Sequence, residues 1–109
     1  MQYKVDFKKI KWEVPFEGIK HKYLDQENIR VRLVEYDRNM PPHWCEKSHY
    51  GYVLEGIFEI EFDDQTIRYE KGDGLFLPAS IKHRHKGRAI TEKALIFFIE
   101  MLSNGNSFF

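Results

Sequence analysis

Apolar and polar residues alternate with a period of two along most of the chain. In "NIRVRLVEY", Ile29, Val31 and Leu33 share one face, while Arg30 and Arg32 take the other. The same alternation is present in "HYGYVLEG" and "IFEIEF". This pattern predicts antiparallel strands, each with an apolar and a polar side, and spacing typical of helices is almost absent.

Turn-forming strings separate these runs at intervals of about eight to twelve residues. They are "EG", "DDQ", "KGDG" and "PAS". Short, regularly spaced strands of this kind predict a small antiparallel sandwich or barrel. The last apolar run, "KALIFFIE", predicts a buried final strand because it is apolar on both faces, and its β-branched and aromatic residues favour a strand over a short helix.

Composition narrows the class of protein. The 109 residues are 42% apolar and 16% aromatic, and 17 basic residues balance 17 acidic ones. A neutral chain lacks the basic footprint of a nucleic-acid-binding or membrane-binding protein. The amino-terminal segment has no apolar stretch typical of a signal peptide, and the run "ALIFFI" is too short to cross a bilayer. We therefore expect a cytoplasmic protein that binds neither nucleic acid nor membrane.

The length predicts a single domain over residues 1–109. Residues 1–15 are expected to form an amino-terminal arm or an edge strand. Residues 103–109 are expected to form a tail, which ends in Phe108 and Phe109 and is either disordered or docked on a partner subunit.

Potential metal ligands gather in two short segments. His43, Cys45 and His49 lie in the first segment, and His83 and His85 lie in the second. Within each segment the spacing is even, so on extended strands these side chains face the same side. Neutral imidazoles and a thiolate suit zinc, iron, nickel or copper. If the two segments meet, four of these donors can surround one transition-metal ion.

The same residues also have structural interpretations. The histidines could be partly exposed strand residues, and Cys45 could be a small buried filler. A nucleophile–base couple of Cys45 and His49 is disfavoured, because residues four apart on one strand face are too distant to hydrogen-bond directly. A single cysteine cannot form an internal disulfide, which fits a reducing compartment. The shared parity and the second histidine segment favour metal binding.

These segments resemble the two motifs of the cupin superfamily. "HWCEKSHYGYVLEG" places His43, Cys45 and His49 where the first motif has two histidines and a glutamate, and it ends on the motif glycine, Gly56. "GDGLFLPASIKH" places His83 at the histidine of the second motif. Cysteine therefore replaces the second motif histidine, and histidine replaces the glutamate.

The resemblance covers residues 29–100 and implies an all-β fold, a small antiparallel jelly-roll barrel. It implies four ligands for one zinc, iron, nickel or copper ion: His43, Cys45, His49 and His83. His85 is then an alternative ligand, or it orients one of the ligands.

The resemblance also implies function. One possibility is a metal-dependent enzyme acting on a small molecule, as a dioxygenase, isomerase or lyase. The other is a non-enzymatic module that binds or senses a small molecule, with or without metal. Because small cupins are commonly dimers, the resemblance also implies a homodimer. Tyr52, Trp44 and Phe76 are candidate pocket aromatics, with a core position as the alternative, which is favoured for Phe76.

Overall fold

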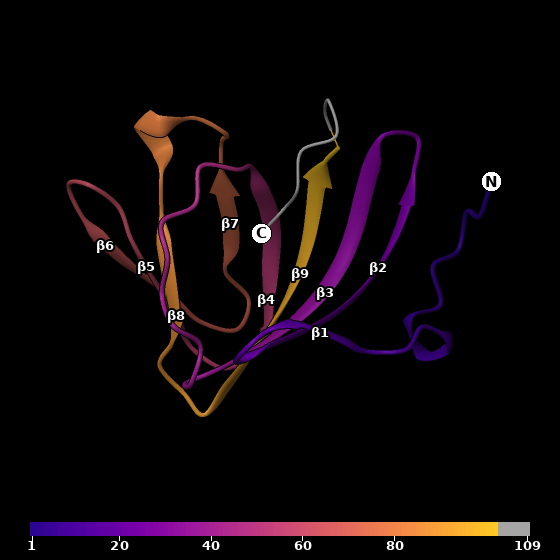
Figure 1. Ribbon diagram of the computed structural model, residues 1–109, viewed down its shortest axis with the longest axis horizontal. Coiled ribbons are helices and arrows are strands. Elements are labelled where there is room, and N and C mark those ends of the chain that lie inside the picture. The colour runs from indigo at the N-terminus through magenta and orange to yellow at the C-terminus, as the bar shows by residue number, and fades with distance from the viewer. Residues whose placement is uncertain (103–109) are drawn as a thin grey trace.

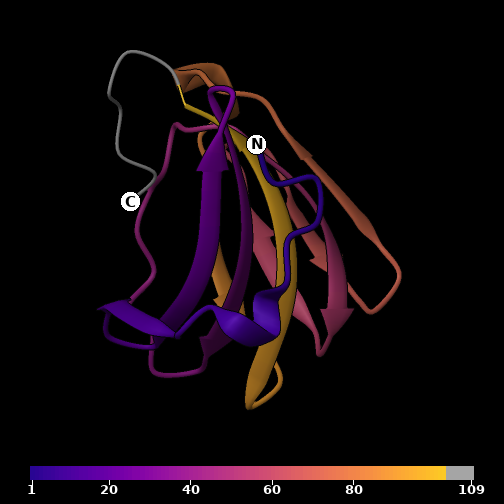
Figure 2. The same cartoon turned by 90° about the vertical axis from the view of Figure 1, so that its right-hand side faces the viewer.

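Two antiparallel β-sheets face each other in the computed structural model, which describes residues 1–102 (Figures 1 and 2). The larger sheet has the strand order β1-β2-β3-β9-β4-β7, and the smaller has the order β6-β5-β8. The strands are β1 (Glu13–Phe16), β2 (Ile19–Gln26), β3 (Ile29–Asp37), β4 (His49–Glu55), β5 (Phe58–Glu61), β6 (Thr66–Tyr69), β7 (Gly74–Leu77), β8 (Lys86–Ala89) and β9 (Lys93–Met101). Two 3₁₀ turns, η1 (Phe7–Lys9) and η2 (Ile81–His83), complete the secondary structure.

The predicted all-β jelly-roll fold is confirmed. The segment "KALIFFIE" forms strand β9, as expected, and not a helix. β9 lies between β3 and β4, and it pairs antiparallel with both. Strands from distant parts of the chain therefore meet at β9, and their inward side chains line the space between the sheets.

The core fills that space with alternate residues of the facing strands. In β5, Phe58 and Ile60 point inward and are nearly inaccessible, as the alternation predicts. The apolar core consists of Ile19, Val34, Met40, Val53, Phe58, Ile60, Tyr69, Leu75, Leu77, Ala89, Ala94, Ile96 and Phe98. Tyr36, Phe62 and Ile67 pack against it. The core residues hold the two sheets together and fix the position of the polar side chains among them.

The face of β3 that carries arginines is the inward one, which corrects the expectation of a solvated polar side. Arg32 is only 1% exposed, whereas Ile29 on the other face is 37% exposed. Period-two alternation separates two faces but does not show which one is buried. Arg32 can face the core because a buried carboxylate, that of Glu100, forms an ion pair with it.

The amino-terminal residues lie against the larger sheet. β1 forms its edge next to β2, and Phe7 of η1 packs edge-on against Phe97 of β9, with ring centroids 6.2 Å apart. The tail predicted for residues 103–109 lies outside the described residues. Within residues 1–102, no helix has the length and apolar character needed to span a membrane.

Tight turns set the register of the strands. β2 and β3 are joined by Glu27 and Asn28, whose φ angles of 53° and 62° are those of a type I′ hairpin turn. After β4, Gly56 adopts a φ of 81°, and a side chain there would collide with the backbone of Lys93. These turns hold β3 and β4 in fixed register beside β9.

Candidate metal centre

Three soft donor side chains meet between the sheets. The ligand atoms of Cys45, His49 and His85 all lie within 4.8 Å of one another. His49 and His85 are 8% and 6% exposed, and Cys45 is half-buried. The two histidine- and cysteine-bearing segments therefore come together as the sequence predicted, although the set of side chains differs from the one that the resemblance implied.

An isolated β-bridge joins the two segments. Cys45 donates its backbone N–H to the carbonyl of His85 at 2.8 Å, and His85 donates in return to the carbonyl of Cys45 at 2.9 Å. Directly opposed residues of an antiparallel pair project their side chains to the same side of the sheet. The bridge thus fixes the thiol and the His85 imidazole as neighbours.

His49 completes the group as the first residue of β4. Its Nε2 atom lies 3.6 Å from the Cys45 sulfur, within hydrogen-bonding distance for sulfur. The expectation that these residues are too far apart to hydrogen-bond is wrong. It assumed one continuous strand, but residues 46–48 are not part of a strand and β4 begins only at His49.

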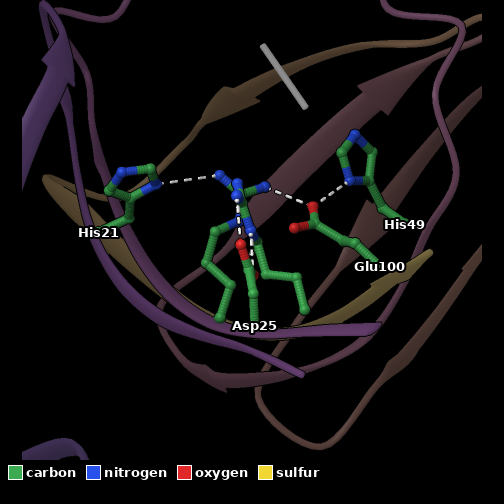
Figure 3. A network of polar contacts seen from close by, with 6 residues as sticks. His21, Asp25, His49 and Glu100 are labelled. Atoms are coloured by element: carbon green, nitrogen blue, oxygen red, sulfur yellow. Dashed lines mark hydrogen bonds and ion pairs between the residues drawn. The ribbon is translucent and has the colours of Figure 1, made fainter. Parts of the chain in front are cut away.

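The other ring nitrogen of His49 is held by a buried carboxylate (Figure 3). His49 Nδ1 donates to Glu100 Oε2 at 2.5 Å, and the same oxygen accepts from Arg32 at 2.5 Å. Arg32 also lies 3.3 Å from the ring nitrogen Nδ1 of His21. Because an ionised carboxylate only accepts hydrogen bonds, the proton of the neutral His49 ring is on Nδ1, which leaves the Nε2 lone pair facing Cys45.

Glu100 and Arg32 are functional residues that were not predicted from the sequence. Glu100 is completely buried, and Arg32 is 1% exposed. The sequence does contain a signal for Glu100. It lies at even spacing from Ala94, Ile96 and Phe98, and therefore on the same side of a mostly apolar strand. A charged residue on the inward row of a buried strand requires a partner, and that requirement marks a candidate site.

His85 is oriented in the same way by the main chain. Its Nδ1 atom lies 3.3 Å from the carbonyl oxygen of His83, which can only accept. His85 therefore also directs Nε2 away from this contact. His83 contributes this oxygen, while its imidazole is exposed at the end of η2 and lies outside the group.

The remaining predicted site residues lie around or away from this group. His43 is exposed and lines the cavity beside the donors without joining the group. Trp44, 38% exposed, packs under the guanidinium of Arg84 at 4.4 Å. Tyr52 and Phe76 do not line the cavity, and Phe76 is 75% exposed, so the core position favoured for it is wrong.

A small cavity of about 60 Å³ opens beside the donors. That space admits a few water-sized groups and not a whole drug-sized ligand. Its lining is mostly apolar apart from the donors, Arg32 and His43. The lining residues are Ile19, Arg32, Tyr36, Met40, His43, Cys45, His49, Phe58, Ile60, Leu77, His85, Gly87 and Phe98.

The contacts within the group change its acid–base properties. Burial alone raises the pKa of Cys45, but hydrogen bonds with His49 and His85 outweigh burial and lower that pKa to about 5. Burial alone lowers the pKa of His49, but its contacts with Cys45 and Glu100 raise that pKa overall. At neutral pH the metal-free Cys45 is therefore a thiolate, and its contact with His49 favours the protonated form of that imidazole.

Comparison with known proteins decides the family. Residues 30–99 match the family model of the cupin domain. The protein is a cupin. The matched range includes all three donors of the group and Arg32, and it ends one residue before Glu100.

Among curated proteins, this cupin is 28% identical over 74 residues to Protein SchB of Streptomyces halstedii, covering 67% of the chain and 54% of SchB. It is 27% identical over 56 residues to "Polyketide synthase CurC" of Streptomyces cyaneus, covering 51% of the chain and 36% of CurC. The cupin therefore matches about half of SchB and about a third of CurC.

Solved structures of low sequence identity share the fold. The polyketide cyclase RemF of Streptomyces resistomycificus superposes with a TM-score of 0.75 at 21% identity, covering 94% of this cupin and 81% of RemF. KdgF of Halomonas sp. superposes with a TM-score of 0.73 at 23% identity, covering 95% and 96% of the two chains. These similarities establish the architecture of the cupin, and its chemistry has to be argued from its own residues.

Proposed function

We propose that this cupin binds one transition-metal ion through Cys45, His49 and His85 and uses it to hold and activate a small molecule. The observation that carries this proposal is the orientation of the two imidazoles. Each engages Nδ1 with an acceptor, a carboxylate for His49 and a carbonyl for His85, so both Nε2 lone pairs are available at the thiol. Histidines that bind metals in proteins are held in this manner.

The spacing of the donors fits one ion. From bond lengths of about 2.3 Å to sulfur and 2.0 Å to nitrogen, two such ligands of a tetrahedral ion lie ~3.5 Å apart. The sulfur of Cys45 and Nε2 of His49 are separated by 3.6 Å. Three protein donors beside a cavity leave a position for a water or a substrate, which is typical of catalytic metal sites and not of closed structural ones.

The donor set also limits the choice of metal. One thiolate and two imidazoles suit zinc, iron, nickel or copper, and they are poor ligands for magnesium or calcium. When bound, such an ion acts as a Lewis acid that polarises a carbonyl oxygen. The chain's own contribution is to engage Nδ1 of both histidines, through Glu100 and the carbonyl of His83, so that both Nε2 atoms are directed at one point.

For the reaction, we infer an isomerase or lyase acting on a carbonyl compound, ahead of a dioxygenase. RemF is named as a polyketide cyclase and CurC as a polyketide synthase, which supports a carbonyl-bearing substrate. Given the size of the cavity, only the reacting end of such a molecule enters it. A non-enzymatic binding or sensing module is the alternative, and turnover of a library of small carbonyl compounds distinguishes the two.

Elemental analysis of untagged protein, purified without chelator, tests the metal proposal. About one equivalent of a single transition metal per chain supports it. Full occupancy that survives replacement of both His49 and His85 by alanine contradicts it, because the metal then lies elsewhere.

A second candidate function uses the same residues without metal. Cys45, His49 and Glu100 form a row in which a thiol contacts an imidazole that is held by a carboxylate. This is the order of groups in enzymes with a nucleophilic cysteine. Covalent labelling of Cys45 by a substrate-like electrophile, with turnover unaffected by chelators, favours this function over the metal-dependent one.

We further propose that the cupin is a cytoplasmic homodimer that associates through the outer face of its larger sheet. Tyr52, Phe76 and Ile99 are 49%, 75% and 38% exposed there, and Tyr50 pairs with both Phe76 and Ile99. Adjacent exposed apolar side chains mark association surfaces. A monomer mass in sedimentation at micromolar concentration contradicts the dimer, and Phe76→Lys is expected to weaken it.

A further inference from the structure

One polar group in the cavity takes no part in the network described above, the hydroxyl of Tyr36. Tyr36 lies on the inward row of β3 with Arg32 and Val34, and it lines the cavity together with Cys45, His49 and His85. Within residues 1–102 its hydroxyl makes no hydrogen bond. A tyrosine hydroxyl without a partner in the protein can donate a hydrogen bond to a ligand.

The ring of Tyr36 is fixed, so its hydroxyl is held in place. It packs against Phe58 of the opposite sheet with centroids 4.6 Å apart, and the small side chain of Ala94 lies beside it on β9. Tyr36 lines the same cavity as Arg32 and Cys45. Burial raises the pKa of Tyr36, so this group keeps its proton and serves as a hydrogen-bond donor.

The charges around the cavity favour a negatively charged ligand. The Cys45 thiolate neutralises one of the two positive charges of a bound divalent ion, and the charges of Arg32 and Glu100 cancel each other. Among the described residues, none with a carboxylate and no lysine lines the cavity. With both histidines neutral, as metal binding requires, one positive charge is left uncompensated in a largely apolar space.

We propose that this cavity takes a small monoanion, of the carboxylate class, with one oxygen at the metal position, and that the Tyr36 hydroxyl donates a hydrogen bond to that ligand. The inference rests on the proposed metal site. Tyr36 is then a specificity-determining residue that selects ligands with an oxygen acceptor. The apolar lining by Ile60, Leu77 and Phe98 contacts the short hydrocarbon part of the ligand.

Cobalt(II) loading provides a test that does not depend on turnover. Cobalt bound to Cys45 and two imidazoles gives a thiolate charge-transfer band and visible d–d bands. Acetate is the probe, and acetamide is its neutral control of the same shape. We expect acetate to change the d–d bands of the wild-type protein in a saturable manner, while acetamide at the same concentration leaves them unchanged.

Tyr36→Phe keeps the ring and its packing, and removes only the hydroxyl. Because a hydrogen bond to a charged group is worth about 1.5–3 kcal/mol, we expect this variant to bind acetate about tenfold more weakly or worse, with unchanged cobalt affinity. Tyr50→Phe is the matched control, because Tyr50 packs against Phe76 and does not line the cavity. It should bind acetate as the wild type does.

The outcomes separate this inference from the proposed function. If the protein takes up no cobalt with a thiolate band, the metal proposal fails and this inference fails with it. If cobalt binds but acetamide acts as well as acetate, the monoanion is contradicted while the metal site stands. If Tyr36→Phe binds acetate within about twofold of the wild type, the role of Tyr36 is contradicted.

Discussion

Cys45 and His85 face each other as a backbone hydrogen-bonded pair, with N–H to carbonyl distances of 2.8 and 2.9 Å in the two directions. This pairing brings the segment before β4 next to the segment before β8. The thiol of Cys45 and the imidazole of His85 consequently lie side by side. The second donor histidine, His49, is the first residue of β4. The candidate metal site therefore depends on main-chain geometry as much as on side-chain identity.

Two neighbouring histidines are expected to differ sharply in their effect on metal content. His85→Ala removes a donor of the group and should lower stoichiometric metal to a small fraction. His83→Ala should leave it nearly unchanged, because the exposed His83 imidazole lies outside the group while its carbonyl remains in place. Elemental analysis of both variants checks this. Equal loss in the two would mean that the imidazole of His83 is a ligand.

Replacing Glu100 by glutamine should weaken both the site and the fold. It removes the carboxylate that holds His49, which is expected to reduce metal affinity by about 10–100-fold. It also deprives the buried Arg32 of its counter-charge, at a cost of about 3 kcal/mol in the free energy of unfolding. Denaturant unfolding and metal competition measure the two effects.

The surface pair of Arg30 and Asp25 is the control for that experiment. It has similar geometry, at 2.7 Å, but lies at the surface, so Asp25→Asn should cost less than about 1 kcal/mol. If Glu100→Gln is no more destabilising than Asp25→Asn, the buried network contributes little to the fold.

His21 should make the protein less stable in acid. Burial and then the charges of Arg32 and Arg30 lower the pKa of His21 from 6.5 to about 4. Between these values the unfolded chain binds a proton that the folded protein does not, so stability falls as the pH falls from 6.5 to 4. His21→Gln should remove about 1–3 kcal/mol of this pH-dependent loss, measured by denaturant unfolding at several pH values. Parallel curves for variant and wild type would refute the role of His21.

Cys45 should react as a thiolate in the metal-free protein. With a pKa of about 5, its alkylation by iodoacetamide should hardly vary between about pH 6.5 and 8, whereas an ordinary thiol accelerates more than tenfold over that range. His49→Ala should restore much of the ordinary pH dependence, because it removes a hydrogen bond that stabilises the thiolate. Added zinc should protect Cys45. Alkylation that rises steeply with pH in the wild type argues against the contact with His49.

Much of the fold could be predicted from the sequence, because strand periodicity and turn residues are local properties. The run "IFEIEF" folded as expected, with Phe58 and Ile60 inside, and "KALIFFIE" became the central strand β9. The inward face of β3 was not predictable from alternation, because Arg32 is buried only in the company of Glu100. That pairing joins residues far apart in the sequence.

The candidate site was predicted in composition more than in geometry. The prediction from even sequence spacing assumed an unbroken strand. It correctly placed Cys45 and His49 on one side, but it did not predict their direct contact. The second segment does not form one strand either, because His83 ends a 3₁₀ turn and only His85 enters the bridge. The spacing of a family motif could not show this, because it assigns ligands by their position in the sequence. Which side chains meet beside the cavity depends on the direction in which each side chain points.

X-ray absorption at the metal edge tests the proposed centre most directly, on untagged protein purified without chelator. The site described here predicts one sulfur at about 2.3 Å and two imidazole nitrogens at about 2.0–2.1 Å, with the remaining position filled by oxygen. The sulfur contribution should disappear in Cys45→Ser. A wild-type protein whose metal has only nitrogen and oxygen neighbours would contradict the proposed ligand set.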